Sequence, residues 1–284
     1  MVDRWTTIDG AVVHFIDTAP GGTGPSIVVI PGFLSSTECF AQFAGALSSA
    51  LRVVVVDMPG FGRSEAPTAA WSLPFCERFI ERFMDAAGLT STVLLGSSMG
   101  AGIAVQAAAS APARVDALVL LNPVGLRGPM DSRAAGPAGP RILSALDPLI
   151  PLLCALMPQF LVGAMLRAQV VDPGVLTADV RAAYWRPFRS VRGRRVVAQA
   201  ARALIAHPAL DHRVHEIRQP ILIVEGSANP MGSPGLRDEL ARAIPGCAVE
   251  VLEGHGHILA LEAPERLAET ISLWLSGRDQ RSEK

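Results

Sequence analysis

Short runs in which almost every residue is apolar recur along the chain, and each run ends at a turn residue or a polar residue. Five of them stand out, at residues 27–30, 53–56, 92–95, 117–121 and 221–224. A strand covered on only one face alternates apolar and polar positions, whereas these runs show no alternation. We therefore predict buried strands of a mostly parallel sheet that has helices on both of its faces.

Segments with apolar residues at helical spacing lie between these runs and after the last of them. They cover residues 40–50, 75–87, 101–109, 236–244 and 265–275. Two more strands are expected, an early one at residues 12–17 and a last one at residues 249–252. Alternation of strands and helices in this manner is typical of a doubly wound α/β sheet.

The interval from residue 124 to residue 218 breaks this rhythm, because it contains no convincing strand. A Gly/Pro-rich loop opens it, apolar helix candidates follow at residues 142–166, and an arginine-rich segment covers residues 181–202. We predict a core made of residues 1–123 and 219–284. Residues 124–218 would form a helical cap inserted over the carboxyl edge of the sheet, where doubly wound sheets bind their ligands.

Composition gives no indication of nucleic acid or an anionic membrane as a partner. Half of the 284 residues are apolar and the formal net charge is −1, so nothing favours nucleic acid. The longest apolar stretch, residues 149–166, contains Pro151 and Pro158, which a single membrane-spanning helix tolerates poorly. The N-terminus lacks the pattern of a signal peptide. We expect no membrane span and a cytoplasmic location, and the sequence leaves the oligomeric state open.

The sequence also lacks the usual signatures of cofactors. Its cysteines are scattered and show no metal-ligand spacing, which is typical of reduced thiols. Residues 21–24 are rich in glycine, but the lysine and the helix of a phosphate-binding loop are missing. We expect no cofactor and no metal. The cysteines are Cys39, Cys76, Cys154 and Cys247.

One turn carries the strongest chemical signal. Residues 96–100 read Gly-Ser-Ser-Met-Gly and lie between an apolar strand and an alanine-rich helix. The central residue of such a tight turn is strained, and glycines two positions to either side leave room for it. Ser98 would then stand beside a helix N-terminus, which favours developing negative charge. We predict that Ser98 is a nucleophile, because Ser97 lacks glycine at those two positions.

A serine hydroxyl needs a base near neutral pH. His257 is the preferred base, because it follows the last expected strand and precedes the final helix, so that it can reach Ser98 across the sheet edge. His255 is the local alternative. We expect His14 to face out of an early strand. The other three histidines are expected at the surface near the end of the cap: His207, His212 and His215.

Two further segments make a family resemblance clear. Residues 57–64 read Asp-Met-Pro-Gly-Phe-Gly-Arg-Ser, and residues 257–264 read His-Ile-Leu-Ala-Leu-Glu-Ala-Pro. Together with the turn at residues 96–100 and Pro-Gly-Phe at residues 31–33, they resemble motifs of the α/β-hydrolase superfamily, in the branch with a single helical cap. The resemblance covers nearly the whole chain. It implies an α/β-hydrolase fold in which Ser98 is the nucleophile and the first residue of the 257–264 segment is the base.

The resemblance also implies an oxyanion hole. In the family, two backbone N–H groups form it, and the matching residues here are Phe33 and Met99. Pro31 stands where the family usually has histidine, which changes the hydrogen bonding of the loop but leaves the Phe33 N–H available. Three other residues of the motifs are expected to stabilise loops rather than to catalyse: Asp57, Ser64 and Glu262.

The chain departs from the family at the third member of the catalytic triad. The acid normally follows the seventh strand, three residues beyond a glycine, and here that position is Asn229. Some relatives carry the acid after the sixth strand, where this chain has Asn122. Both customary acid positions are therefore amides. Glu225 is the nearest carboxylate that could have taken over the role, although it lies before the turn.

Three interpretations of this departure remain open. Asn229 could orient His257 in a weak hydrolase, in which case Asn229→Asp should raise esterase activity. Ser98 and His257 could instead serve a lyase, cyclase or isomerase by moving a proton and steadying an oxyanion. In the third interpretation, the fold binds a ligand and catalyses little or nothing.

The cap gives a general indication of the substrate. Its apolar residues between 149 and 166 favour a lipophilic ester, thioester or lactone, and the alternative is that they merely pack the cap on the core. Tyr184 and Trp185 are candidates for lining the pocket. The arginines between residues 181 and 202 are expected to form a solvated face, with attraction of an anionic carrier as the alternative. Serine rather than aspartate at position 98 argues against haloalkane dehalogenase and epoxide hydrolase chemistry.

Overall fold

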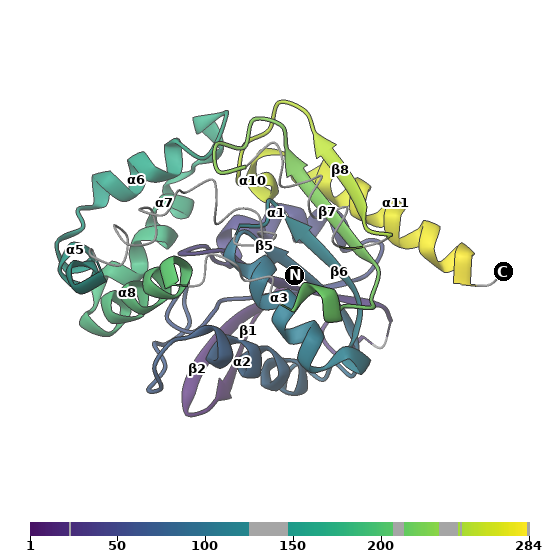
Figure 1. The fold of residues 1–284 in the computed structure, drawn as a ribbon, viewed down its shortest axis with the longest axis horizontal. Coiled ribbons are helices and arrows are strands. Elements are labelled where there is room, and N and C mark those ends of the chain that lie inside the picture. Colours follow the sequence, from purple (N-terminus) through teal and green to yellow (C-terminus); the bar gives the residue numbers. More distant parts are fainter. Residues whose placement is uncertain (23, 125–146, 207–212, 233–243, 245, 283–284) are drawn as a thin grey trace.

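One eight-stranded sheet forms the centre of the molecule, with strand order β1-β2-β4-β3-β5-β6-β7-β8 (Figure 1). The structure is a computed structural model and describes residues 1–22, 24–124, 147–206, 213–232, 244 and 246–282. The first two strands are antiparallel to their neighbours and the other six run parallel. This sheet and the helices around it confirm the predicted fold class.

The parallel strands form because their residues are apolar on both faces. Every residue of β3 and β4 is buried, so helices cover the sheet on both sides. The strands have these bounds: β1 (Val2–Ile8), β2 (Ala11–Asp17), β3 (Ser26–Ile30), β4 (Arg52–Val56), β5 (Thr92–Ser97), β6 (Val115–Leu121), β7 (Ile221–Gly226) and β8 (Ala248–Leu252).

Five helices of the described core follow the strands, and α1 packs on α11 whereas α2 packs on α3. Their bounds are α1 (Thr37–Leu47), α2 (Leu73–Ala86), α3 (Met99–Ser110), α10 (Leu259–Glu262) and α11 (Pro264–Ser282). Four of the helices predicted from the sequence are therefore present. The fifth, at residues 236–244, falls almost wholly outside the described residues.

Four more helices, which we call the cap helices, gather on one side of the sheet (Figure 1). They are α5 (Ile150–Leu156), α6 (Gln159–Arg167), α7 (Ala178–Trp185) and α8 (Val191–Ala206). All four lie within the interval predicted to be a cap, and the Gly/Pro-rich loop before them, residues 125–140, lies outside the described residues. The boundaries at residues 124 and 218 stay a prediction.

The apolar residues of α5 and α6 are less buried than simple packing on the core would require. Seven of the eleven large apolar residues between 149 and 166 are exposed: Leu149, Leu152, Leu153, Leu156, Phe160, Leu161 and Met165. In the described part of the chain, no single helix is long and apolar enough to cross a membrane. Together α5 and α6 reach the required length and composition, but the pair is bent by 102°.

Gly60 marks a close approach between the core and the cap helices. It has a φ of 86°, and a Cβ added to it would lie 2.7 Å from Cγ1 of Val196 on α8. Only glycine accepts both conditions, because other residues rarely adopt this φ and any side chain would collide with the valine. The loop after β4 therefore packs against α8 at a residue that has no side chain.

Candidate active site

The turn between β5 and α3 holds Ser98 in a strained conformation. Ser98 has φ 54° and ψ −119°, outside the regions that residues with a side chain usually occupy. The two flanking glycines make the turn possible: a Cβ on Gly96 would lie 2.3 Å from the carbonyl oxygen of Gly100, and a Cβ on Gly100 would lie 2.1 Å from that of Ile30. The turn thus presents the Ser98 side chain at the carboxyl edge of the sheet, as the sequence predicts.

His257 lies beside this serine. Its Nε2 is 3.0 Å from Ser98 Oγ, and the ring comes from the loop between β8 and α10. Its Nδ1 is 3.0 Å from Oδ1 of Asn229, which follows β7. The structure therefore brings Ser98, His257 and Asn229 into one hydrogen-bonded line, although 159 residues separate the first two along the chain.

A backbone group determines which atom of Asn229 faces His257, and therefore which nitrogen of the ring carries the proton. The N–H of Met231, which can only donate, lies 3.0 Å from Asn229 Oδ1, so this atom is the amide oxygen. An oxygen facing His257 Nδ1 requires the ring proton to be on Nδ1. Nε2 is then unprotonated and accepts the hydrogen bond from the Ser98 hydroxyl. This is the tautomer that a general base for serine needs.

The other side of Asn229 meets a second amide. Asn229 Nδ2 donates to Oδ1 of Asn122 over 3.1 Å. Asn122 follows β6, is 1% exposed and has a φ of 40°. The two positions where relatives carry the acid are therefore neighbours in space, and here they hydrogen-bond to each other.

Burial keeps the imidazole neutral. His257 is 5% exposed, and desolvation lowers its pKa from 6.5 to about 4. Among the described residues, no carboxylate accepts from its ring, so nothing in this line offsets the cost of a buried positive charge. At neutral pH the ring is therefore ready to accept a proton, but it holds an acquired proton less firmly than a ring beside aspartate would.

The loop after β3 forms the opposite wall of the site. A Cβ on Gly32 would lie 3.0 Å from Ser98 Cβ and 3.6 Å from its Oγ, so this backbone passes directly beside the serine. The next residue is Phe33, and Met99 follows Ser98 at the first position of α3. Within the described part of the chain, neither N–H meets an acceptor. Both are thus available to a ligand.

The expected loop-stabilising residues are engaged with backbone groups. The Asp57 carboxylate accepts from the N–H groups of Thr37 and Arg63 over 2.7 and 2.8 Å. The Ser64 hydroxyl donates to the Asp57 carbonyl over 2.7 Å. These contacts fix the loop after β4 against the start of α1, and none of them reaches Ser98.

The prediction that His14 faces out of its strand is wrong. The ring is fully buried, with Nδ1 at 2.7 Å from Asp57 Oδ2 and Nε2 at 2.7 Å from Asp3 Oδ1. Two carboxylates satisfy both ring nitrogens, which removes most of the cost of burying them. Burial by itself lowers the pKa of His14, but the hydrogen bonds to Asp57 and Asp3 outweigh it and raise the pKa above 6.5.

Glu262 joins the His257 loop to the segment that follows α6. Its carboxylate accepts from the Gly256 N–H over 3.1 Å and from the Val171 N–H over 2.8 Å. The N–H of His257 itself donates to the Gln169 carbonyl over 2.7 Å. Segment 169–171 and the loop of the candidate base are therefore one hydrogen-bonded unit.

The other candidate residues lie outside the hydrogen-bonded line of Ser98, His257 and Asn229. His255 is half-buried, and its Nδ1 has no partner among the described residues. Glu225 lies within β7, one residue before its end, and pairs with Val251 of β8, whereas His257 Nδ1 faces Asn229. His215 is exposed. The last two histidines of the predicted surface group lie outside the described residues: His207 and His212.

Tyr184 lies close to the loop after β3. It is buried, and its hydroxyl interacts with Ser35 and Cys39 of the core, while desolvation raises its pKa well above 10. Trp185 stacks on Phe188 with 5.0 Å between ring centroids. Both aromatic residues predicted for the pocket are therefore engaged in packing.

The arginine-rich segment contacts the core through an ion pair. Arg186 forms a salt bridge to Glu38 of α1 over 2.9 Å. Four other arginines of the segment are exposed, as expected of a solvated face: Arg181, Arg189, Arg192 and Arg195.

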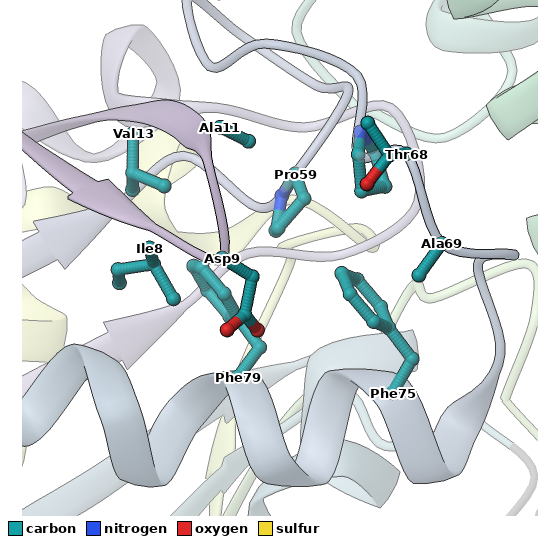
Figure 2. Close-up of a pocket in the computed structure, with 10 residues that line it drawn as sticks. Ile8, Asp9, Ala11, Val13, Pro59, Thr68, Ala69, Phe75 and Phe79 are labelled. Carbon is teal, nitrogen blue, oxygen red and sulfur yellow. The ribbon is translucent and has the colours of Figure 1, made fainter.

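A hollow elsewhere on the molecule does not contribute to the site. It lies between the β1–β2 hairpin and α2, and Figure 2 shows Phe75 and Phe79 rising from the helix toward Asp9 and Pro59. Neither Ser98 nor its partners line it. Its walls are mainly apolar core residues.

A match to a protein-family model shows which family the chain belongs to. The family model described as "alpha/beta hydrolase fold" matches residues 25–264. The chain belongs to this family. The α/β-hydrolase fold here is therefore shown by both sequence and structure, and the expectation of an ester-hydrolase-like enzyme is confirmed at that level.

Individual relatives of this α/β-hydrolase differ in how much of the chain they match. Monoacylglycerol lipase abhd6-B of Xenopus laevis is 27% identical over 281 residues, which is 93% of this chain and 79% of the lipase. A dihydrolipoyllysine-residue acetyltransferase component of an acetoin cleaving system, from Cupriavidus necator, is 33% identical over 129 residues. That match covers 45% of this chain and 34% of the relative, so the matched part is about a third of that protein.

A solved structure is similar across the whole α/β-hydrolase chain. The enol-lactonase of Burkholderia xenovorans has a TM-score of 0.78 and 21% identity, and the match covers 96% of this chain and all of the lactonase. At this identity the likeness shows the fold alone.

Sequence reasoning identified Asn122 as a missing acid but not as a member of the site. A signal for it existed, because β6 and β7 are neighbours in the sheet and residues that follow neighbouring parallel strands meet at the same edge. Gln169 and its bond to His257 carried no signal, because they join segments 88 residues apart through backbone atoms alone.

Proposed function

We propose that this protein is a serine-dependent hydrolase that acts on a lipophilic small-molecule ester, thioester or lactone. The observation that carries the proposal is the line from Ser98 to His257 to Asn229, with both hydrogen bonds at 3.0 Å and the ring in the tautomer of a general base. A nucleophile, a base within hydrogen-bond reach and a group that orients the base are the three parts that acyl transfer by serine requires.

The proposed reaction follows from this geometry. Ser98 Oγ attacks the acyl carbon while its proton moves to His257 Nε2. The carbonyl oxygen of the substrate becomes an oxyanion, which the N–H groups of Phe33 and Met99 stabilise. His257 then gives the proton to the leaving alcohol, thiol or ring oxygen. Water, deprotonated by the same ring, releases the acid from the acyl-enzyme and regenerates the serine.

Asn229 makes this a slow catalyst compared with a full triad. Its oxygen fixes the tautomer and the position of the ring, but a neutral amide stabilises the imidazolium less than a carboxylate does. In a serine protease, exchange of aspartate for asparagine lowers kcat by about 10⁴-fold, largely because the tautomer is lost. Here the tautomer is retained, so we expect a smaller deficit and a preference for activated substrates such as thioesters or strained lactones.

The lipophilic character of the substrate is supported by the composition of the cap helices. The segment between residues 149 and 166 has no charged side chain, and many of its apolar residues are exposed. One relative that matches nearly the whole chain is a monoacylglycerol lipase. A long acyl chain is the group that such a surface would accommodate best.

The amide at residue 229 favours a second candidate function. A ring whose pKa is about 4 is a weak base with little tendency to keep a proton. Such a ring suits a lyase, cyclase or isomerase that borrows a proton briefly and relies on the N–H groups at Phe33 and Met99. In this candidate, Ser98 polarises the substrate without forming an acyl-enzyme.

A covalent probe distinguishes these functions. A fluorophosphonate transfers its phosphorus to an activated serine oxygen with loss of fluoride, so we expect wild type and Ser97→Ala to be labelled and Ser98→Ala to remain unlabelled. Equal labelling of Ser98→Ala would remove this serine from the mechanism. If wild type is labelled but p-nitrophenyl esters with short and long acyl chains and the corresponding acyl thioesters are not hydrolysed, the second candidate takes precedence.

A further inference from the structure

We propose that Asn122 is a positioning residue for the site, and that its fixed amide oxygen selects an amide rather than a carboxylate at residue 229. The inference rests on the proposed roles of Ser98 and His257, which it deepens. It also changes the interpretation of Asn229. The residue is the hydrogen-bond partner that Asn122 requires, and not merely a position at which the acid has been lost.

The orientation of Asn122 is set by backbone groups. Its Nδ2 donates to the carbonyl oxygens of Gly256 and His257 over 3.0 and 2.8 Å. Its Oδ1 accepts from the N–H of Gly226 over 3.0 Å. Turning the amide over would set an oxygen against two carbonyl oxygens and an NH₂ group against an N–H, so only one orientation is possible.

The backbone of Asn122 supports this assignment. The residue has a φ of 40°, a region in which asparagine is found several times more often than most other residues with a side chain. The side chain and the backbone are both buried at the junction of β6 and β7, and Asn122 N–H donates to the Val224 carbonyl over 2.9 Å. Asn122 therefore presents its oxygen to Asn229 from a fixed position.

A fixed oxygen requires a donor opposite to it. Asn229 supplies one, because its Nδ2 lies 3.1 Å from Asn122 Oδ1. An aspartate at residue 229 would place a carboxylate oxygen at this point, where two acceptors repel each other in a buried setting. Rotation offers no relief, since the other oxygen is already held by the Met231 N–H and by His257.

Asn122 acts on catalysis through other residues. One side of its amide fixes Asn229, which orients the His257 ring, and the other side binds the carbonyl of His257 itself. The Glu262 carboxylate, which also contacts this loop, is engaged by the Gly256 and Val171 N–H groups. Asn122 touches no reacting atom, so its contribution is to position the base.

The simple expectation that Asn229→Asp repairs the triad is therefore reversed. With Asn122 present, the new carboxylate is pushed away from its place beside His257. With Asn122 removed, the repulsion disappears and the carboxylate can take up the role of the missing acid. The sign of the effect at residue 229 thus depends on residue 122.

Four proteins test this dependence: wild type, Asn229→Asp, Asn122→Gly and the double variant. Glycine is chosen because it adopts a φ of 40° without strain and leaves space for water. The readout is inactivation by a fluorophosphonate, separated into the rate constant kinact and the affinity KI. Asn229→Asp is expected to lower kinact at least tenfold, and Asn122→Gly to lower it about tenfold with KI unchanged.

In the Asn122→Gly background, adding Asn229→Asp is expected to raise kinact at least threefold. In a plot of kinact against pH, kinact falls on the acid side as His257 becomes protonated, near pH 4. This fall should shift to a higher pH only in the double variant, because a nearby carboxylate raises the pKa of His257. An increase of kinact in Asn229→Asp alone, or an equal effect of this substitution in both backgrounds, would overturn the inference.

A second measurement, of folding stability, does not depend on catalysis. Urea midpoints of the same four proteins should show that Asn229→Asp destabilises the fold more when Asn122 is present than when it is absent. If wild type is not labelled by the probe, the proposed function fails, and the urea cycle still decides the pairing. Additive midpoints would overturn the pairing whatever the catalytic result.

Discussion

The N–H of His257 donates a hydrogen bond of 2.7 Å to the carbonyl oxygen of Gln169. Gln169 belongs to the segment that follows α6, so the backbone of the candidate base is bonded to a segment between the cap helices. Gly256 makes the approach possible, because a Cβ there would lie 2.6 Å from the same carbonyl oxygen. Movement of this segment therefore moves the base.

Removal of the Glu262 carboxylate should loosen this connection. Glu262→Ala leaves the N–H groups of Gly256 and Val171 without their acceptor, and we expect a loss of roughly 2 kcal/mol in the free energy of unfolding. We also expect kinact toward a fluorophosphonate to fall severalfold. Urea denaturation and labelling kinetics provide the two measurements.

The matched control for this prediction is Glu269→Ala. Glu269 is exposed on α11, the helix that comes after α10, and should change stability by no more than about 0.5 kcal/mol. An equal loss in both variants would show that Glu262 is an ordinary surface carboxylate.

Acid should destabilise the fold through His257. Its pKa is about 4 in the folded protein and 6.5 when the chain is unfolded. Between these values the unfolded chain binds a proton that the folded protein does not, so stability falls as the pH decreases from about 6.5 to about 4, by up to roughly 3 kcal/mol. The slope of unfolding free energy against pH should be shallower in His257→Gln, and an unchanged slope would contradict the prediction.

His14 should act in the opposite direction. Because its pKa is raised in the folded protein, the stabilisation that it gives is complete below pH 6.5 and is lost as the pH rises through the folded value. We expect the NMR signal of the His14 ring to titrate above pH 6.5. In Asp57→Asn, which removes one of its two carboxylate partners, the same signal should titrate at a lower pH. A titration at or below 6.5 in wild type would show that burial outweighs the two carboxylates.

The ion pair between Arg186 and Glu38 should hold the cap helices on the core. Burial raises the pKa of Glu38, but the hydrogen bond from Ser36, a backbone hydrogen bond and the charge of Arg186 outweigh it and lower the pKa to about 2. We expect Arg186→Met to reduce stability at pH 7 by about 1–3 kcal/mol, a range between exposed and buried pairs.

The pH dependence adds a check on this pair. A depressed carboxylate pKa gives stability that is present above pH 4.5 and is lost as the pH falls through about 2, so the difference between wild type and Arg186→Met should shrink below about pH 4. Arg186 and Arg189 are the first and last residues of a 3₁₀ turn, Arg186–Arg189, and Arg189→Met, at its exposed end, serves as the control. A difference that is constant with pH would rule out an electrostatic origin.

The turn at Ser98 should tolerate no side chain at its second glycine. A Cβ on Gly100 would lie 2.1 Å from the Ile30 carbonyl oxygen, so we expect Gly100→Ala to destabilise the protein by about 3 kcal/mol or more. A Cβ on Gly163, in α6, meets open space, and Gly163→Ala should stabilise by up to about 1 kcal/mol. Thermal denaturation measures both, and similar melting temperatures would contradict the steric argument.

Sequence patterns predicted the parts of the fold that are buried on both sides. The five apolar runs lie in β3 to β7, because continuous burial leaves a continuous apolar signal. The strand β1 was missed. Its residues are mostly exposed and include Asp3 and Arg4, so an edge strand of this kind resembles a polar loop in sequence.

Long-range pairing explains the errors at individual residues. His14 looked like a surface residue, because no local pattern reveals that Asp57 and Asp3 meet both of its nitrogens. Ser98, His257 and Asn229 were found, because each occupies a fixed offset from a strand end. The hydrogen bond between Asn229 and Asn122 depends on the orientation of two amides, which only the neighbouring backbone groups determine.

The contact between Gly60 and Val196 limits how this enzyme can be engineered. A chimaera that receives helices from another hydrolase would keep the glycine but lose the valine that fills the space above it. The exchanged segment would also have to present a carbonyl to His257 and an N–H to Glu262. Cap exchange that respects only sequence boundaries should therefore yield proteins that fold poorly or lack a positioned base, even when every residue of the core is retained.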